Sequence, residues 1–143
     1  MESYLFIDIS DRTYAVELSK VDEVVKIEHF SKIPGSPNYV RGFFNLRGTI
    51  VTMIEMDSLI DKDKEVSDFD HLVVLHTRNN DEDKVAIVAH QIKDVYNLES
   101  EHIQDVPDAE EEAFKTFVKH MYVDNERSAY IIDIDNVLDL KED

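Results

Sequence analysis

Cysteine is missing from this chain of 143 residues, and only three glycines and three prolines occur. Without cysteine there is no disulfide framework and no thiolate metal site, which fits a reducing compartment. Three glycines are too few for a glycine-rich phosphate-binding loop, and no Gly-x-Ser-x-Gly nucleophile motif is present. These absences exclude disulfide-stapled small domains, nucleotide-binding loops and the nucleophile turn of common hydrolases.

Long apolar runs are also missing. No stretch of about 18 apolar residues, the length that spans a bilayer, is found. The first residues, 1–8, lack the basic region and apolar run of a signal peptide. We therefore expect a soluble cytoplasmic protein without direct membrane insertion, and the length predicts a single domain, residues 1–143.

Basic residues are scarce, with 15 lysines and arginines against 32 acidic residues and a net charge of -17. Nucleic acids and anionic membranes would repel such a chain, so neither is an expected partner. Residues 1–60 carry a net charge of -3, whereas residues 61–143 carry -14. We expect close contact with another acidic protein on the surface of the first half, which includes Arg41 and Arg47.

The residues that favour turns are concentrated between Ile33 and Asp57, where all three glycines and two of the three prolines lie. The turn dipeptides in residues 34–37 precede two predicted strands, 40–46 and 49–56. Between them, Gly48 is suited to the positive φ of a tight hairpin, which places Arg47 at the tip. A short helical turn over 57–60 is expected to follow, with Asp57 as its cap.

The strand pattern occurs twice along the chain. Residues 71–77 match 4–10, residues 85–98 match 14–27, and residues 118–138 match 40–60. Three matches in the same order indicate a degenerate internal duplication. Each copy supplies about five short strands, so we predict an all-β fold with short helices, in which two five-stranded barrels comprise residues 1–66 and 67–143. Whether a strand is exchanged between the barrels stays open.

Strand 50–56 is apolar on both faces. A strand with one face toward water would alternate more cleanly between apolar and polar residues. One face therefore fills its own barrel, and the other packs against the second barrel across a shared apolar interface.

Candidate chemistry is sparse. The six histidines are scattered over different predicted elements, without a convergent set of metal ligands. The carboxylates of Asp133 and Asp135 share one strand face, but solvated carboxylates are the commoner explanation of such a pair. We predict no metal, no cofactor and no catalytic residues, and a protein that works by holding other proteins.

The stretch Val-Arg-Gly-Phe-Phe-Asn-Leu-Arg-Gly-Thr-Ile-Val, residues 40–51, with a proline-containing turn before it, resembles the signature of the CheW-like family of chemosensory adaptors. The resemblance implies two five-stranded SH3-like barrels packed over a shared apolar interface. It also implies a non-enzymatic adaptor, monomeric when free, that couples the cytoplasmic tip of a methyl-accepting chemoreceptor to the regulatory domain of a histidine kinase at membrane-associated arrays.

The resemblance assigns two sets of contact residues. The receptor-binding residues are Val21, Glu23, Gly42, Asn45, Arg47 and Gly48, with the glycines expected to permit the backbone path. Kinase contacts are expected at the barrel ends, near Lys62, Phe69, Val85 and Val123. The chain departs from the family pattern chiefly in its second half, for example at His90, where an aspartate is frequent.

Two other interpretations remain. The same adaptor fold can serve a non-flagellar chemosensory pathway such as pilus motility. Alternatively, the protein binds or hydrolyses a small molecule in a cleft between the barrels, although few convergent polar groups support this.

Overall fold

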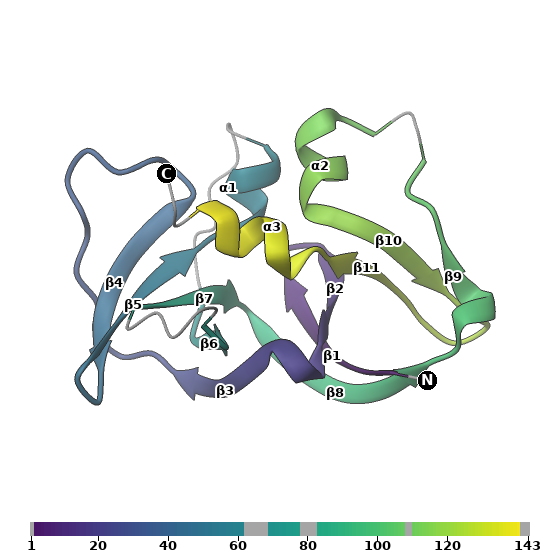
Figure 1. Ribbon diagram of the computed structural model, residues 1–143, viewed down its shortest axis with the longest axis horizontal. Coiled ribbons are helices and arrows are strands. Elements are labelled where there is room, and N and C mark those ends of the chain that lie inside the picture. The colour runs from purple at the N-terminus through teal and green to yellow at the C-terminus, as the bar shows by residue number, and fades with distance from the viewer. Residues whose placement is uncertain (1, 62–68, 78–82, 108–109, 141–143) are drawn as a thin grey trace.

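The computed structural model describes residues 2–61, 69–77, 83–107 and 110–140. Within these ranges the chain is mostly strand, with short helices (Figure 1). The strands are β1 Glu2–Ile9, β2 Arg12–Glu17, β3 Val21–Lys26, β4 Val40–Leu46, β5 Thr49–Ile54, β6 His71–Leu75, β7 Lys84–Ala89, β8 Gln91–Leu98, β9 Ile103–Gln104, β10 Val118–Val123 and β11 Ser128–Ile132. The helices are η1 Leu18–Lys20, α1 Met56–Ile60, η2 Ser100–His102, α2 Glu112–Phe117 and α3 Ile134–Asp139.

The predicted hairpin around Arg47 is present, with β4 and β5 joined by Arg47 and Gly48 alone. Both residues have positive φ, 51° and 90°, the requirement of a type I′ turn. The side-chain oxygen of Asn45 accepts a hydrogen bond of 2.7 Å from the Gly48 backbone N–H. The turn is therefore fixed by its backbone and by one side chain.

The strands form two sheets, one with the order β8-β1-β2-β11-β10-β9 and the other with the order β3-β6-β7-β5-β4. We call the five-stranded sheet the first barrel and the six-stranded sheet the second barrel. In the first barrel the Ser31 backbone exchanges hydrogen bonds of 2.9 and 2.8 Å with Phe43, which ties the chain after β3 to β4. The all-β prediction is confirmed, with one sheet larger than expected by the two-residue strand β9.

The two barrels have the same strand order once the repeat is applied. Segments β1, β2, β3, β4 and β5 correspond to β6, β7, β8, β10 and β11, so β3-β6-β7-β5-β4 corresponds to β8-β1-β2-β11-β10. In both cases the first two strands of one copy pair with the last three strands of the other. The parallel pairs β5 with β7 and β2 with β11 join the two halves of the chain.

The expected boundary between the two barrels, at residues 66 and 67, therefore does not separate the two sheets. The first barrel takes its strands from the continuous range 21–89, and the second takes them from 2–17 and 91–132. Repetition in a sequence shows which segments are alike, but it does not show which copy a segment pairs with. That pairing is a property of the fold.

Buried apolar residues form three clusters. One fills the first barrel and includes Val51 and Met53, and a second fills the other barrel and includes Phe6 and Ile131. The largest lies between the barrels, and we call it the shared core; its fully buried members include Ile7, Ile9, Tyr14, Val73, Leu75, Ile87, Ala89 and Ile132. The predicted shared apolar interface is therefore present.

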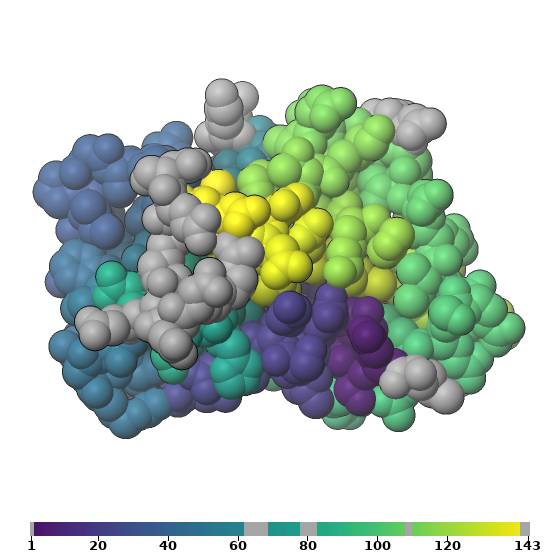
Figure 2. Space-filling model, in the orientation of Figure 1, coloured from purple at the N-terminus to yellow at the C-terminus, as the bar shows by residue number. Residues whose placement is uncertain are grey.

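The three α-helices lie close together where the barrels meet. Contacts join α1 to α2 and α2 to α3, and Figure 2 shows α3 in yellow on the surface between the lobes. The Asp133 side chain caps α3 by accepting from the Asn136 backbone N–H at 3.1 Å. The expected cap of α1 was wrong, because Glu55 occupies the N-cap position and Asp57 lies buried inside the helix.

Candidate protein-docking surface

Arg47 and Glu23, two of the residues assigned to receptor binding, form an ion pair. The Arg47 Nη2 atom donates to the Glu23 Oε2 atom. The hairpin tip presents Arg47, whose side chain is 67% exposed, and β3 presents Glu23, whose side chain is 29% exposed. Glu23 and Arg47 are 24 residues apart in the sequence, so the contact between their charges is produced by the fold.

The other hairpin residues assigned to receptor binding, Gly42, Asn45 and Gly48, determine the path of the backbone. Asn45 and Gly48 make the turn, as described above. A Cβ atom at Gly42 would lie 2.3 Å from the Ser31 carbonyl oxygen and 2.7 Å from the Phe30 ring. Gly42 therefore permits the close approach of the chain at residues 30 and 31.

Val21 is half-buried and packs against the shared core, so part of its side chain belongs to the interior. Among the exposed large apolar residues, three lie on η1, β3 and β8: Leu18 at 39%, Val24 at 40% and Val95 at 42%. We call these three residues the apolar strip. The sequence did not predict that these three residues are exposed, because each continues an apolar pattern that is typical of core residues.

The apolar strip borders the shared core. Val24 pairs with Val73 across β3 and β6, and Val95 pairs with Leu5 across β8 and β1, and both partners are buried in that core. Val24 and Val95 occupy corresponding positions in the repeat. Strands β3 and β8 run along one side of the molecule with η1 between them (Figure 1). Val24 on the first barrel and Val95 on the second thus lie next to the shared core. Glu23 precedes Val24 on β3 but pairs with Val74 of the first-barrel cluster, so its side chain is on the opposite face of the strand.

A second charged group lies on the same strand. The Lys84 ammonium donates to the Asp22 carboxylate, and the His76 Nδ1 atom is 3.7 Å from that carboxylate. The hydrogen bond from Lys84 is the main reason that the pKa of Asp22 is below its ordinary value. Lys84 is 62 residues from Asp22 in the sequence, so no local pattern could have predicted the pair.

Arg41, the other arginine expected at a contact surface, faces inward. Its Nη1 atom is 3.4 Å from the Glu55 carboxylate, and its guanidinium lies 5.6 Å from the centre of the Phe69 ring. Glu55 is buried. Arg41 therefore serves the packing of the first barrel more than its surface.

The residues assigned to kinase binding are scattered. Val85 is only 3% exposed within the shared core, so its side chain is not available to a partner. Phe69 is half-buried on the first barrel, with its ring centre 5.7 Å from that of Phe30. Val123 is half-buried at the end of β10, beside a groove of about 500 Å³ in the second barrel. Lys62 lies outside the described residues.

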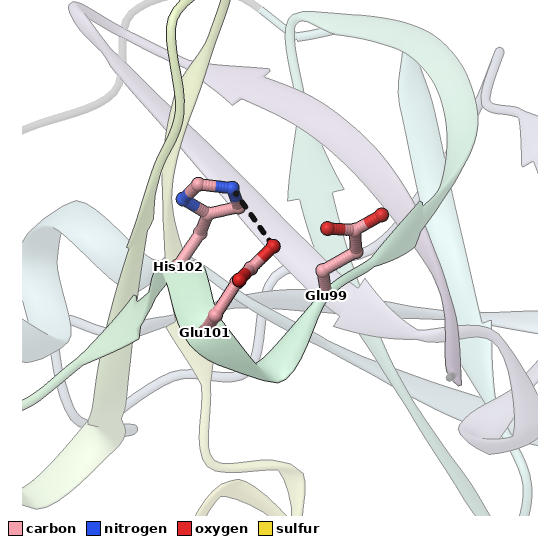
Figure 3. Close-up of side chains that lie close together, drawn as sticks. All are labelled: Glu99, Glu101 and His102. Atoms are coloured by element: carbon pink, nitrogen blue, oxygen red, sulfur yellow. Dashed lines mark ion pairs between the residues drawn. The ribbon is translucent and has the colours of Figure 1, made fainter.

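Among the described residues, the fold places potential metal ligands of Glu99, Glu101 and His102 within 4.8 Å of one another (Figure 3). The His102 Nε2 atom is 3.6 Å from the Glu101 carboxylate, and a hydrogen bond with Glu101 raises the pKa of Glu99. Both glutamates are exposed, and exposed acidic groups of this kind are common without an ion. We assign no metal to this group.

Among the described residues, none of the helices has the length and apolar character needed to cross a membrane. The sequence-assigned receptor residues thus provide one exposed ion pair on the first barrel, and an apolar strip is exposed near the junction of the two barrels. Such a combination can bind a protein segment by apolar contact with a polar rim.

Comparison with known proteins identifies the family. The model of the CheW-like domain matches residues 3–142. The chain belongs to the CheW-like domain family. It is therefore a scaffolding or coupling protein of chemotaxis, and the family is non-enzymatic.

Several relatives of this CheW-like chain are named chemotaxis protein CheW. That of Klebsiella aerogenes is 23% identical over 141 residues, which cover 99% of this chain and 84% of the relative. That of Bacillus subtilis is 21% identical and covers 96% of this chain and 87% of the relative. That of Helicobacter pylori is 36% identical over 70 residues, or 48% of this chain and 42% of the relative.

The fold has a counterpart among solved structures. The crystal structure of the scaffolding protein TtCheW from Thermoanaerobacter tengcongensis matches with a TM-score of 0.75 and 20% identity. The match covers 92% of this chain and 88% of that one. The resemblance inferred from residues 40–51 is thereby confirmed.

Proposed function

We propose that this CheW-like chain is a cytoplasmic adaptor that couples the tip of a methyl-accepting chemoreceptor to the regulatory domain of a histidine kinase. The observation that carries the proposal is the exposed Arg47–Glu23 ion pair together with the apolar strip. The ion pair joins β3 to the β4–β5 hairpin on the first barrel, and the apolar strip lies on η1, β3 and β8 next to the junction of the barrels.

An amphipathic receptor helix suits this surface. Apolar side chains of the helix would cover Leu18, Val24 and Val95, which removes exposed apolar area from water. On binding, the Arg47 guanidinium and the Glu23 carboxylate would form hydrogen bonds with polar groups of the helix in place of part of their contact with each other. Such polar contacts fix the register of the helix more than they increase its affinity. The receptor must therefore offer an apolar stripe with both acidic and basic groups beside it.

The test is receptor binding by variants that leave the hairpin intact. Arg47→Asn is suited to it, because asparagine tolerates the positive φ at this position. We expect Arg47→Asn to weaken binding of a receptor cytoplasmic fragment by about tenfold, as loss of a hydrogen-bonded charge implies. Calorimetry or co-elution with the fragment measures the change.

Lys119→Gln is the matched control. It removes a comparable exposed ion pair, in which the Lys119 Nζ atom is 2.9 Å from the Glu17 carboxylate on the second barrel. Receptor affinity should be unchanged in this control. Equal affinity of wild type and Arg47→Asn for the receptor fragment would contradict the assignment of the site.

Kinase binding is proposed at the barrel ends, near Val123 and Phe69. Both side chains are apolar and half-buried at barrel surfaces, which supports a role in packing against another protein. Val123→Glu should weaken binding of the kinase regulatory domain and leave receptor binding intact. If Val123→Glu binds both partners as wild type does, the second barrel end is not the kinase site.

The competing small-molecule interpretation gains no support from the junction of the barrels. The space that it requires is filled by the shared core, whose members are apolar. A pathway such as pilus motility would use the same surfaces and differ only in the receptor and kinase that occupy them.

A further inference from the structure

Glu55 is a buried carboxylate at the N-cap of α1, with 2% of the residue exposed. Its Oε2 atom accepts a hydrogen bond of 2.8 Å from the Ser58 hydroxyl. Its Oε1 atom is 3.4 Å from the Arg41 Nη1 atom. A buried charge requires a counter-charge and hydrogen bonds, because its hydration is lost. Glu55 therefore directs the guanidinium of Arg41 toward the start of α1.

The same guanidinium lies over an aromatic ring. Arg41 is on β4, and its guanidinium carbon is 5.6 Å from the centre of the Phe69 ring. A cation within about 6 Å of a ring centre is attracted to the negative face of the ring. The Phe69 side chain is half-buried, so part of it remains at the surface. Arg41 thus connects a buried carboxylate to a partly exposed ring.

Phe69 has a second neighbour that the backbone holds in place. The centre of the Phe30 ring is 5.7 Å from that of Phe69. Phe30 precedes Ser31, whose backbone is paired with that of Phe43 on β4. The Phe30 ring also lies close to Gly42, where a Cβ atom would be 2.7 Å from it. The ring of Phe69 is therefore packed against groups whose own positions are fixed.

We propose that Glu55 is a positioning residue of the kinase surface, which acts through Arg41 to hold the Phe69 ring in the orientation that the kinase regulatory domain contacts. The inference rests on the proposed function, in which Phe69 belongs to that surface. A side chain that is already held in its bound orientation loses less conformational entropy on binding, so affinity increases. The kinase domain contacts the ring, and Glu55 itself stays covered.

The test measures affinity for the kinase regulatory domain with variants of the full chain. Glu55→Gln keeps the size of the side chain and removes the charge that attracts Arg41. Arg41→Met keeps a long side chain and removes the cation. We expect each to weaken kinase binding by about fivefold, the effect of one side chain that is no longer held in its bound orientation. Affinity for a receptor cytoplasmic fragment should not change in either variant.

A double variant separates positioning from a loss of stability. Because Glu55 acts through Arg41, the variant with both Glu55→Gln and Arg41→Met should bind the kinase domain as Arg41→Met alone does. Ser58→Ala is the matched control, since it removes a buried hydrogen bond of the same carboxylate and keeps the charge that attracts Arg41. It should lower the melting temperature and leave kinase affinity unchanged.

Phe69→Ala distinguishes this proposal from the proposed function. We expect it to weaken kinase binding by about tenfold, because the contact itself is lost. Wild-type kinase affinity in Phe69→Ala would remove Phe69 from the kinase surface and overturn the positioning role as well. Weakened binding in Phe69→Ala with wild-type affinity in Glu55→Gln would leave the kinase surface in place and overturn only the role of Glu55. Additive losses in the double variant would overturn that role too.

Discussion

Arg47 is held in place twice. Its backbone supplies the first positive φ of the hairpin turn, and its side chain pairs with Glu23 on β3. An exposed ion pair of this kind contributes little stability, because its charges are screened by water. Replacement of the Arg47 side chain should therefore have little effect on the stability of the fold.

Gly42, assigned to the receptor site, is required for steric reasons. Because a Cβ atom there would lie 2.3 Å from the Ser31 carbonyl oxygen, Gly42→Ala should lower the free energy of unfolding by about 2 to 3 kcal/mol. Urea unfolding measures the loss. A stability equal to that of wild type would show that the chain at Ser31 moves aside freely.

Asp124 gives the clearest pH dependence at this scale. A hydrogen bond from the Tyr122 hydroxyl, then backbone N–H groups of Glu126 and Arg127 at 2.7 and 2.8 Å, lower the pKa of Asp124 to about 2. The unfolded value is about 3.9, so the carboxylate stabilises the β10–β11 turn above that pH. This contribution is lost as the pH falls from about 4 to about 2.

A carbon-13 NMR titration of the Asp124 carboxyl group measures the effect directly. We expect a midpoint near pH 2 in wild type and a higher midpoint in Tyr122→Phe, because the principal donor is then missing. If the two midpoints coincide, the Tyr122 hydroxyl does not control this carboxyl group.

At the scale of elements, the β4–β5 hairpin shows how far the sequence predicts the structure. Its strands, turn residues and position of Arg47 were all predicted from the placement of glycine and the apolar alternation. These signals are local, because a turn and its two strands lie within 15 residues. The partners of the hairpin could not be predicted, because Glu23 and the Ser31 backbone reach it through long-range folding.

The same limit applies to Val85. It was expected at a kinase contact near a strand end, and it lies near the start of β7 with its side chain buried in the shared core. The apolar strip was missed, because an exposed valine and a core valine look alike in a strand pattern. Burial depends on which strand covers the residue, and that information is not local.

The hairpin turn itself can be tested at Gly48, whose φ is 90°. Gly48→Ala should lower the free energy of unfolding by about 1 kcal/mol, because alanine is strained there, whereas Gly48→Asn should cost less. No atom of the described residues lies within 4 Å of a Cβ atom at this position, so the expected loss comes from backbone strain. Equal losses for the two variants would contradict a turn that requires positive φ at this position.

At the scale of the whole molecule, the halves of the chain are intertwined. Each half, 1–66 and 67–143, contributes strands to both sheets. The internal duplication was predicted, but the exchange of strand pairs was left open, because equivalent segments from either copy suit the same place in a sheet.

This arrangement predicts the behaviour of fragments. Separate fragments 1–66 and 67–143 should each lack a cooperative unfolding transition, since each would expose its share of the shared core. Mixing the two should restore near-ultraviolet circular dichroism and cooperative unfolding. A fragment 1–66 that unfolds cooperatively by itself would contradict the strand exchange.

The most direct test of the docking surface is to map it without mutation. Amide signals of the labelled protein, followed while a receptor cytoplasmic fragment is added, report which strands the receptor contacts. We predict the largest changes on β3, the β4–β5 hairpin around Arg47, and β8 near Val95. Changes confined to β10, β11 and α3, with the signals of Glu23 and Arg47 unmoved, would contradict the proposed site.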